Sequence, residues 1–499
     1  MTVSTLRKIS VGYLLMPNLI FAWGWFIPSI SFLVIFMLLL LYIRELGKKA
    51  DRDQLGFTLA DLGFLVGIAA VWTFLSGNGG YSFQISDSYG HNSKFYDLAA
   101  HEWPYYFPGV NRLIRYYFGY YLVPALIFKM FGQVYPSVIF AWTFLGFLLG
   151  ISWVYILLLK NKTFVVVFLL IGGIGTILFR ILSKMYLFES QVNTFNINIG
   201  SIFDQSRWVP NQLIPSLIVG CIILYDTSVS KRFQESVFPI TLSLTWAIFP
   251  FVSLCTIFAV NFLFNVKRSD LLTFRIIPLY ILPFVCLAPT LAYFAAGEKL
   301  PVHGFVWEFA GDGPFIIRYL TGVFLDAVIV YVIYRLLADR TALLSRNLMT
   351  ALFILFFCLS SFVVGKWNDW LTKMNISFLV IFLICILRLL HTRWTNKEWK
   401  PSHWGLSLTL ALVLCLNFSH QFLILMQPLQ SNVVVSAVTD KAFVATPYNA
   451  HGDLYKTLRK TGSLEEAQQY MAMKNSFYEQ YLAKKRVTLL SIKKPEFSR

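Results

Sequence analysis

Long apolar runs, each about the length of a membrane-spanning helix, follow one another along almost the whole chain. About 20 apolar residues in an α-helix cross the hydrocarbon core of a bilayer. The runs lie at about 11–43, 58–76, 113–131, 136–159, 163–179, 208–226, 237–265, 276–296, 315–337, 347–365, 375–391 and 403–426. With 57% hydrophobic and only 13% charged residues, the composition excludes a soluble enzyme, a disordered chain and a disulfide scaffold. The sequence predicts an all-α polytopic membrane protein with about 11–13 transmembrane helices.

The positions of the basic residues predict which loops face the cytoplasm. Lys and Arg number 42 against 25 Asp and Glu, which gives a formal net charge of +17. In a soluble chain this excess would suggest nucleic acid. Here the basic loops are short and join apolar runs, so the positive-inside rule places them in the cytoplasm and we expect no nucleic-acid partner. These loops are 44–52, 160–162, 230–232, 267–275, 339–346 and 393–400. The loops 77–112, 180–207, 297–314 and 366–374 are then external.

Two apolar runs do not fit a simple alternation of sides. Run 113–131 has an aromatic-rich start, so we expect an amphipathic, interfacial or re-entrant helix belonging to the first external loop. Run 237–265 joins two basic loops and must cross an even number of times, so Pro250 is expected to mark a bend between two half-spans. The chain divides into a transmembrane domain at 1–426 and an external soluble tail at 427–499, and we expect the tail to be helical between 463 and 485.

The first external loop carries a dense set of ionisable side chains. Asp87 and His91 are four residues apart, as are Asp97 and His101, so each pair shares one face if the segment is helical. No Gly or Pro occurs between 92 and 103, which favours a short helix there. A carboxylate beside an imidazole suits acid–base chemistry or substrate binding. A metal site lacks a tight ligand motif, and an exposed loop with aromatic side chains at the headgroups is the third alternative.

Polar side chains also gather in two later external loops. Arg207 at the mouth of a span is suited to clamp a phosphate, or it extends to the lipid headgroups. Lys366 and Lys373 lie on the external side against the positive-inside bias, which favours an anionic ligand or a headgroup contact. The amides and carboxylates that accompany these basic residues are Asn211, Gln212, Asn368 and Asp369.

Three short patterns resemble a known group of membrane proteins. The first is Asp87-x3-His91-Asn92 with Asp97-Leu98, Trp103-Pro104 and the aromatic run 116–125. The others are Trp208-x-Pro210-Asn211-Gln212 and Asn368-Asp369 with Lys373 four positions on. In this order and on the external side, they resemble bacterial multispanning proteins of the GT-C glycosyltransferase superfamily. The likeness covers residues from about 58 to 391.

This resemblance implies a GT-C-like bundle in a bacterial cytoplasmic membrane, with an active face outside. Such enzymes transfer a sugar from a polyprenyl-phosphate donor to a glycan or lipid acceptor of the cell envelope. Carried over by position, the base is Asp87, with Asp97 or Glu102 as second choice, and Arg207, Lys366 and Lys373 hold the lipid phosphate. The other residues expected to bind substrate are His91, Asn92, His101, Trp103, Trp208, Asn211, Gln212, Asn368 and Asp369.

The chain also departs from the pattern of that superfamily. Pro-Asn-Gln follows the tryptophan where Pro-Gln-His is expected, and Lys373 stands where an arginine is expected. The second change replaces a planar fork of donors by a point charge. A divalent cation, Mg²⁺ or Mn²⁺, stays open as a cofactor, and no metal ligands are assigned. The alternative functions are a lipid-linked oligosaccharide polymerase or ligase, a transporter and a non-catalytic assembly subunit.

Overall fold

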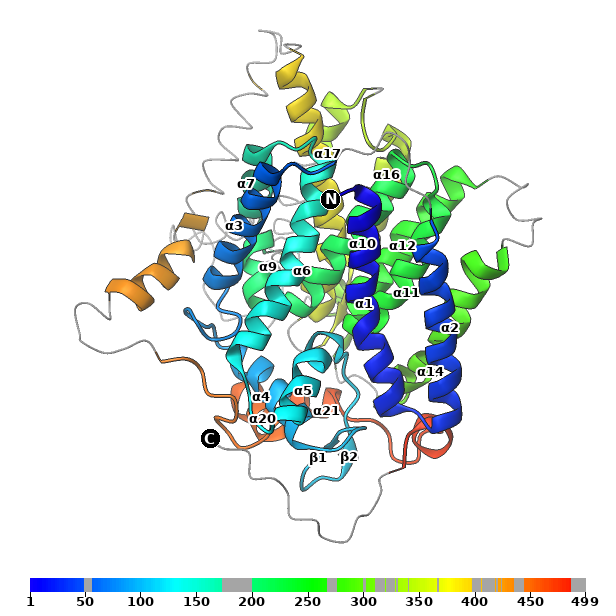
Figure 1. Cartoon of the computed structure of the whole chain (residues 1–499), viewed down its shortest axis with the longest axis vertical. Coiled ribbons are helices and arrows are strands. Elements are labelled where there is room, and N and C mark those ends of the chain that lie inside the picture. Colours follow the sequence, from blue (N-terminus) through cyan, green and yellow to red (C-terminus); the bar gives the residue numbers. More distant parts are fainter. Residues whose placement is uncertain are drawn as a thin grey trace.

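The computed structural model describes residues 1–48, 56–172, 200–266, 276–298, 302–309, 331–339, 341–365, 368–396, 424–434 and 444–485, with isolated positions between 319 and 422. Helices dominate these residues (Figure 1). The strands in the described part form only two small antiparallel sheets. These are β1 (Tyr106–Phe107) with β2 (Arg112–Leu113), and β3 (His303–Phe305) with β4 (Phe362–Val364). The expected all-α class is confirmed.

Apolar helices of membrane-spanning length recur along the described chain. Five are long and apolar enough to cross a bilayer: Pro28–Leu46, Pro136–Leu157, Ile248–Asn265, Ile277–Ala295 and Trp370–Thr395. The helix bounds are α1 (Val3–Trp25), α2 (Pro28–Leu46), α3 (Leu59–Leu75), α4 (Ser88–Ala100), α5 (Gly119–Phe131), α6 (Pro136–Leu157), α7 (Lys162–Leu170), α9 (Ile202–Trp208), α10 (Pro210–Ser228), α11 (Val237–Trp246), α12 (Ile248–Asn265), α14 (Leu282–Ala295), α16 (Arg346–Ser360), α17 (Asn375–Thr395), α20 (Leu454–Thr461) and α21 (Leu464–Gln469).

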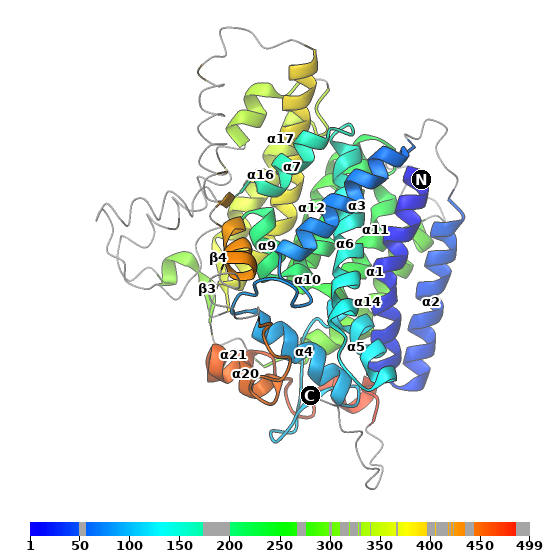
Figure 2. The ribbon, with the colours of Figure 1, turned by 60° about the vertical axis from the view of Figure 1, so that its left-hand side comes forward.

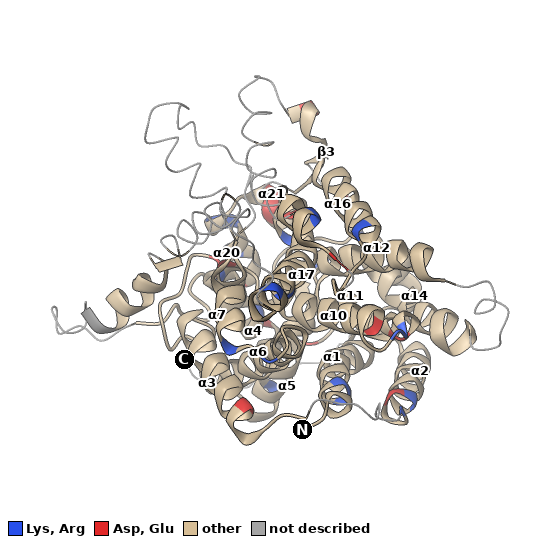
Figure 3. Ribbon diagram, turned by 90° about the horizontal axis from the view of Figure 1, so that it is seen from above, with Lys and Arg blue, Asp and Glu red and all other residues tan. Residues whose placement is uncertain are grey.

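The long helices form a bundle with two distinct ends (Figure 1). The N-terminal end carries the first residues of the chain, the end of α2 and the start of α3. The opposite end, here called the loop end, carries α4, the β1–β2 hairpin, α20 and α21, and Figure 2 shows these elements beneath the bundle. Figure 3 looks onto the N-terminal end, with Lys and Arg in blue and Asp and Glu in red.

Helix α10 forms the centre of the bundle. Its residues from Pro210 to Asp226 are all buried, and it packs against α6, α11, α12 and α17. Small residues allow these helices to approach closely. A Cβ atom on Gly150 of α6 would lie 3.0 Å from the Cβ of Leu217. Burial on all sides is typical of a helix in the interior of a bundle.

The first apolar run, 11–43, is split into two helices. Helix α1 ends at Trp25, and α2 begins with Pro28 at its first turn. Proline is favoured there because its missing N–H has no intrahelical partner to lose. The two helices pack side by side in Figures 1 and 2.

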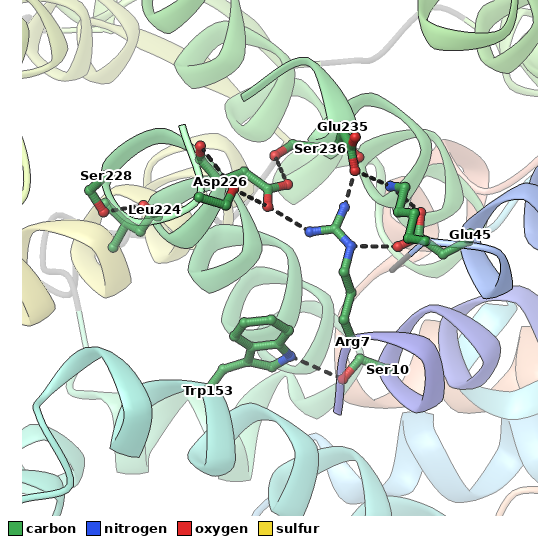
Figure 4. Close-up of polar contacts among 11 residues, drawn as sticks. Arg7, Ser10, Glu45, Trp153, Leu224, Asp226, Ser228, Glu235 and Ser236 are labelled. Carbon is green, nitrogen blue, oxygen red and sulfur yellow. Dashed lines mark hydrogen bonds and ion pairs between the residues drawn. The ribbon is translucent and has the colours of Figure 1, made fainter. Parts of the chain in front are cut away.

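Five charged side chains join α1, α2 and α10 at the N-terminal end, and we call them the N-terminal ion network (Figure 4). Arg7 forms an ion pair with Glu45 and another with Asp226, at 2.6 Å, and donates a hydrogen bond to the Glu235 carbonyl at 2.9 Å. Lys48 pairs with Glu45 at 2.6 Å and with the Glu235 carboxylate at 2.7 Å. Buried charges need such partners, because an unpaired one carries a desolvation cost of several kcal/mol.

Run 237–265 turns back on itself, but not at the expected residue. Helix α11 ends at Trp246, and the extended backbone of Ala247 (φ −167°, ψ 117°) separates it from α12. Pro250 lies in the first turn of α12, where a proline breaks no intrahelical hydrogen bond. Phe258 of α12 contacts Phe233 before α11, with ring centroids 6.0 Å apart. The chain therefore returns to the N-terminal end, with α11 as a short arm and α12 as a longer one.

Helix α5 is too short to cross a bilayer. Its 13 residues extend over about 20 Å, against roughly 30 Å of hydrocarbon. Its start presses on the turn of the α11–α12 hairpin, because a Cβ atom on Gly119 would lie 2.8 Å from the Trp246 Cα. This agrees with the expectation that run 113–131 does not form a full span.

The C-terminal segment 444–485 packs along the loop end. The Asn92 amide donates to the Thr446 carbonyl at 2.7 Å, and the Leu454 N–H donates to Asp97 at 2.7 Å. The Arg115 N–H donates to the Tyr470 carbonyl at 2.8 Å. The expectation of one helix over 463–485 is wrong, because α21 ends at Gln469 and is followed by three isolated β-bridges and a short helical turn at Tyr478–Leu482. The segment lies on the same end of the bundle as loop 77–112, which matches the common side assigned to both.

Candidate functional site

Asp87 lies at the N-cap of α4 in an unusual environment. Its side chain is exposed, yet enough protein surrounds it to hinder solvation of the carboxylate. This desolvation raises the pKa of Asp87 to about 6, against the opposing attraction of Lys373 and Lys94. The nearby carboxylates of Glu466 and Asp369 raise it further. We call these five residues the charge cluster.

Lys94 is the more deeply buried of the two cations in the charge cluster. It is 6% exposed, and its ammonium lies 4.5 Å from the centroid of the Tyr116 ring and 5.7 Å from that of Tyr121. Among the described residues it has neither an ion pair nor a hydrogen bond to its ammonium. Burial lowers the pKa of Lys94 to about 8, and the neighbouring Lys373 lowers it further. A buried ammonium that contacts aromatic faces and has no carboxylate partner in the described part of the chain retains its capacity to bind an anion.

The second cation of the charge cluster comes from a distant part of the chain. Lys373 lies in the helical turn Trp370–Met374 and pairs with Asp369 at 2.8 Å. Its ammonium is 6.0 Å from the centroid of the Phe249 ring, at the turn of the α11–α12 hairpin. The α11–α12 hairpin therefore contacts this cation through Phe249. Asp369 and Lys373 both act electrostatically on Asp87. The fold therefore brings together residues that are more than 280 positions apart in the chain.

His91 connects three elements instead of presenting a free imidazole. One ring nitrogen, Nε2, lies 2.9 Å from the Trp208 carbonyl, and the other, Nδ1, lies 2.6 Å from the Tyr121 hydroxyl. Because a carbonyl only accepts, Nε2 must carry the proton, and Nδ1 accepts from the tyrosine. Burial lowers the pKa of His91 to about 3, so the ring is neutral at physiological pH. Both nitrogens are engaged, and the ring joins α4 to Tyr121 of α5 and to Trp208 at the end of α9.

The amides at the start of α10 are fully enclosed. The Gln212 side chain donates to the Tyr117 hydroxyl at 3.0 Å. The Gln212 carbonyl oxygen and both polar atoms of the Asn211 side chain are buried and have no hydrogen-bond partner among the described residues. Trp208 is 42% exposed, and Asn368, with φ at 52°, is buried beside Asp369. Gln212 is linked to the charge cluster through Tyr117, whose ring centroid lies 4.1 Å from that of the Tyr116 ring that contacts Lys94.

Several other predicted residues lie away from Asp87 and hold the loop end together. Asp97 is fully buried, accepts from the Tyr105 hydroxyl and the Leu454 N–H, and has a pKa raised by desolvation to about 7. His101 stacks on Tyr105, with ring centroids 5.3 Å apart. Trp103 is buried and donates to the Leu98 carbonyl at 2.9 Å. Asp97 thus anchors the C-terminal segment.

The last three predicted residues are separate cases. Glu102 is exposed. The Arg207 guanidinium donates to Gln427 at 2.9 Å and lies 5.7 Å from the centroid of the Phe83 ring, so its contacts differ from those of the charge cluster. Lys366 lies outside the described residues.

Sequence reasoning missed two members of the charge cluster. A signal for Lys94 was available, because positions 87, 91 and 94 have the i, i+4, i+7 spacing of one helical face. Glu466 lies in α21, and no local pattern connects it with loop 77–112. Among the described residues there is no group of three or more His, Cys, Asp or Glu arranged to hold a metal ion.

Comparisons with known proteins add no relative. No protein-family model, no curated protein and no solved structure matches this chain. The case for function therefore rests on the charge cluster itself.

Proposed function

We propose that this chain is an integral membrane glycosyltransferase that moves a sugar from a polyprenyl-phosphate donor to a cell-envelope glycan or lipid. The transfer takes place at the loop end, on the external face, and Asp87 is the base. One feature carries the proposal: Asp87, an accessible carboxylate with a raised pKa, caps the helix that holds the buried ammonium of Lys94, and that ammonium has no ion pair among the described residues. The resemblance of loop 77–112 to GT-C proteins supports the same assignment.

The raised pKa suits Asp87 to act as a general base. A carboxylate with a pKa of about 6 is mostly ionised at pH 7, yet it binds a proton more strongly than an ordinary aspartate. It accepts the proton of an acceptor hydroxyl while the hydroxyl oxygen attacks the anomeric carbon of the donor sugar. The bond between that carbon and the donor phosphate oxygen breaks, and the phosphate leaves with the electron pair.

The two lysines suit the charge that forms on the leaving group. As the glycosidic bond breaks, negative charge grows on the phosphate, and positioned cations stabilise it most where water is excluded. Lys94 is buried, and Lys373 is only partly accessible. The five apolar helices of membrane-spanning length suit a protein embedded in a bilayer, and a polyprenyl chain needs the same lipid environment.

The test compares three purified proteins in nanodiscs: the wild type, Asp87→Asn, and the control Glu102→Gln. Each is incubated with radiolabelled polyprenyl-phosphate sugars, and transfer or slow hydrolysis is measured. Loss of a positioned base lowers rates by about 10²- to 10⁴-fold, so we expect that loss for Asp87→Asn. Glu102→Gln removes an exposed carboxyl group from the same loop, and it should retain activity within about twofold.

Two results would contradict the proposal. Full activity of Asp87→Asn would exclude this carboxylate as the base. Absence of turnover by folded wild-type protein with every single-sugar donor would favour the oligosaccharide polymerase or the non-catalytic subunit instead.

A further inference from the structure

The last part of the described chain is bonded to the loop-side ends of two helices of membrane-spanning length. The Met473 N–H donates at 2.7 Å to the carbonyl of Ala296, the residue that follows α14. The Ile27 N–H, directly before α2, donates to the Leu482 carbonyl at 2.9 Å. Helix α2 and the helix that contains α14 are both long and apolar enough to cross a bilayer. Residues 473–485, here called the rim segment, therefore lie at the level where these spans end, and Figure 1 shows them in red beneath α2.

A buried tyrosine holds the rim segment against the bundle. Tyr478 lies in the helical turn Tyr478–Leu482, its side chain is fully buried, and its hydroxyl donates to the Trp25 carbonyl at 2.7 Å. Its ring packs nearly perpendicular to that of Tyr293 in α14, with centroids 5.1 Å apart, and it also contacts the Phe26 ring at 6.0 Å. The rim segment is thus a fixed part of the edge of the bundle.

The neighbours of this tyrosine are aromatic side chains that the protein leaves uncovered. Phe477 is 64% exposed and Tyr481 is 61% exposed, and their ring centroids are 5.2 Å apart. Trp23, near the end of α1, is 54% exposed, and the Lys484 ammonium lies 5.1 Å from the centroid of its ring. Aromatic rings are enriched at the level of the lipid headgroups, where one part of the ring meets apolar chains and another meets water.

The uncovered apolar surface continues along α2. Phe32, Phe36 and Ile43 are among its exposed side chains. On a helix that crosses a bilayer, exposed apolar side chains face lipid. Because α2 begins at Pro28, directly after the backbone contact between Ile27 and the rim segment, the aromatic side chains of that segment extend the lipid-facing surface at its edge.

The rim segment also carries an excess of positive charge. Its basic residues are Lys474, Lys484 and Lys485, and its acidic residue is Glu479. The Glu479 carboxylate accepts from the Asn475 N–H at 3.0 Å, within the segment itself. Lysines at the edge of an apolar surface extend their stems along it and bring their ammonium groups to lipid phosphates.

We propose that the rim segment is a membrane-interface anchor. Its exposed aromatic side chains enter the headgroup region of the surrounding bilayer, and its lysines bind the phosphates of anionic phospholipids. Three observations favour lipid over a protein partner: the backbone bonds to two span ends, the continuity with the exposed face of α2, and the basic residues beside the aromatic ones. The inference does not depend on sugar transfer.

The experiment places a photoreactive benzoylphenylalanine at Phe477 or at Tyr481 of the full chain. The protein is reconstituted in nanodiscs of phosphatidylcholine and phosphatidylglycerol in equal amounts, and mass spectrometry identifies the products after irradiation. We expect phospholipid adducts at both positions. Leu464 is the matched control, because it is 48% exposed in the same C-terminal segment but is followed by the carboxylates of Glu465 and Glu466. The lipid adduct should be lost there. Adducts with a second copy of the chain in place of lipid, or no lipid adduct at Phe477 and Tyr481, overturn the inference.

The ratio of the two lipid adducts tests the role of the lysines. One basic residue near an anionic surface favours the charged lipid about fivefold, so phosphatidylglycerol adducts should predominate by about that factor. The ratio should fall to about one when Lys484→Gln and Lys485→Gln are combined. The control combines Lys456→Gln with Lys460→Gln, which removes two exposed lysines of α20 and should keep the original ratio. Equal adducts before any lysine is changed, or the same fall in both pairs, overturn the assignment to anionic headgroups.

A measurement on the unaltered protein covers the case in which the photoreactive variants do not fold. A diazirine attached to the phospholipid then labels the wild type, and carbene adducts on residues 473–485 are compared with those around Leu464. Adducts no more frequent on the rim segment overturn the inference in the same way. Neither readout involves turnover, so its failure is distinct from failure of the proposed function.

Discussion

Replacing Arg7 by methionine should destabilise the protein more than any surface change. The substitution keeps the apolar length of the side chain and removes the guanidinium that contacts Asp226 at 2.6 Å, Glu45, and the Glu235 carbonyl at 2.9 Å. Both carboxylate partners are almost fully enclosed, with side-chain exposures of 2% for Glu45 and 3% for Asp226. Removal of one partner from such a pair costs about 3–5 kcal/mol.

The loss should fall mainly on Asp226. Glu45 keeps Lys48 as a partner at 2.6 Å, whereas the side-chain donors left to Asp226 among the described residues are hydroxyls, Ser236 at 2.8 Å and Ser230 at 3.4 Å. A second substitution, Asp226→Asn, should therefore recover part of the stability lost in Arg7→Met. The recovery follows because the uncompensated charge disappears with the carboxylate.

The assay is the free energy of unfolding, measured by titration with SDS in mixed micelles. Lys8→Met is the matched control, because it removes a positive charge from the next residue of α1, where the side chain is only partly buried. We expect a loss below about 1 kcal/mol for the control. Equal stability of Arg7→Met and Lys8→Met would refute the reasoning, as would a further loss in the double variant.

Two further predictions concern the loop end. The transfer rate should follow a bell-shaped pH profile, with limbs near pH 6 for deprotonation of Asp87 and near pH 8 for deprotonation of Lys94. The rate should therefore fall about tenfold when the pH is lowered from 7 to 5. A flat profile between pH 5 and pH 7 would contradict the role of Asp87. Asp97→Asn weakens the acceptor of the Leu454 N–H and should lower the free energy of unfolding by about 1–3 kcal/mol and speed proteolysis of segment 444–485. It should leave the rate within about threefold while that segment stays docked, and a loss as large as that of Asp87→Asn would show that Asp97 takes part in the chemistry.

The helical framework could be predicted because it depends on local properties of the chain. The length of an apolar run limits what it can cross, and Pro28 marks the start of a new helix. The even number of passes of run 237–265 follows from basic residues on both sides. Its turn at Ala247, three residues before Pro250, was not predictable, since the extended backbone there has no signal as strong as a proline.

The composition of the site was decided by tertiary structure. Asp87 and Asp97 look alike in the sequence, ten residues apart in one polar loop. The first remains accessible among four charged neighbours, and the second is enclosed by Tyr105 and the backbone of Leu454. Local sequence fixes which residues lie on one helix. The pKa of a side chain depends on charges within a few ångströms of it, and these come from segments hundreds of residues away.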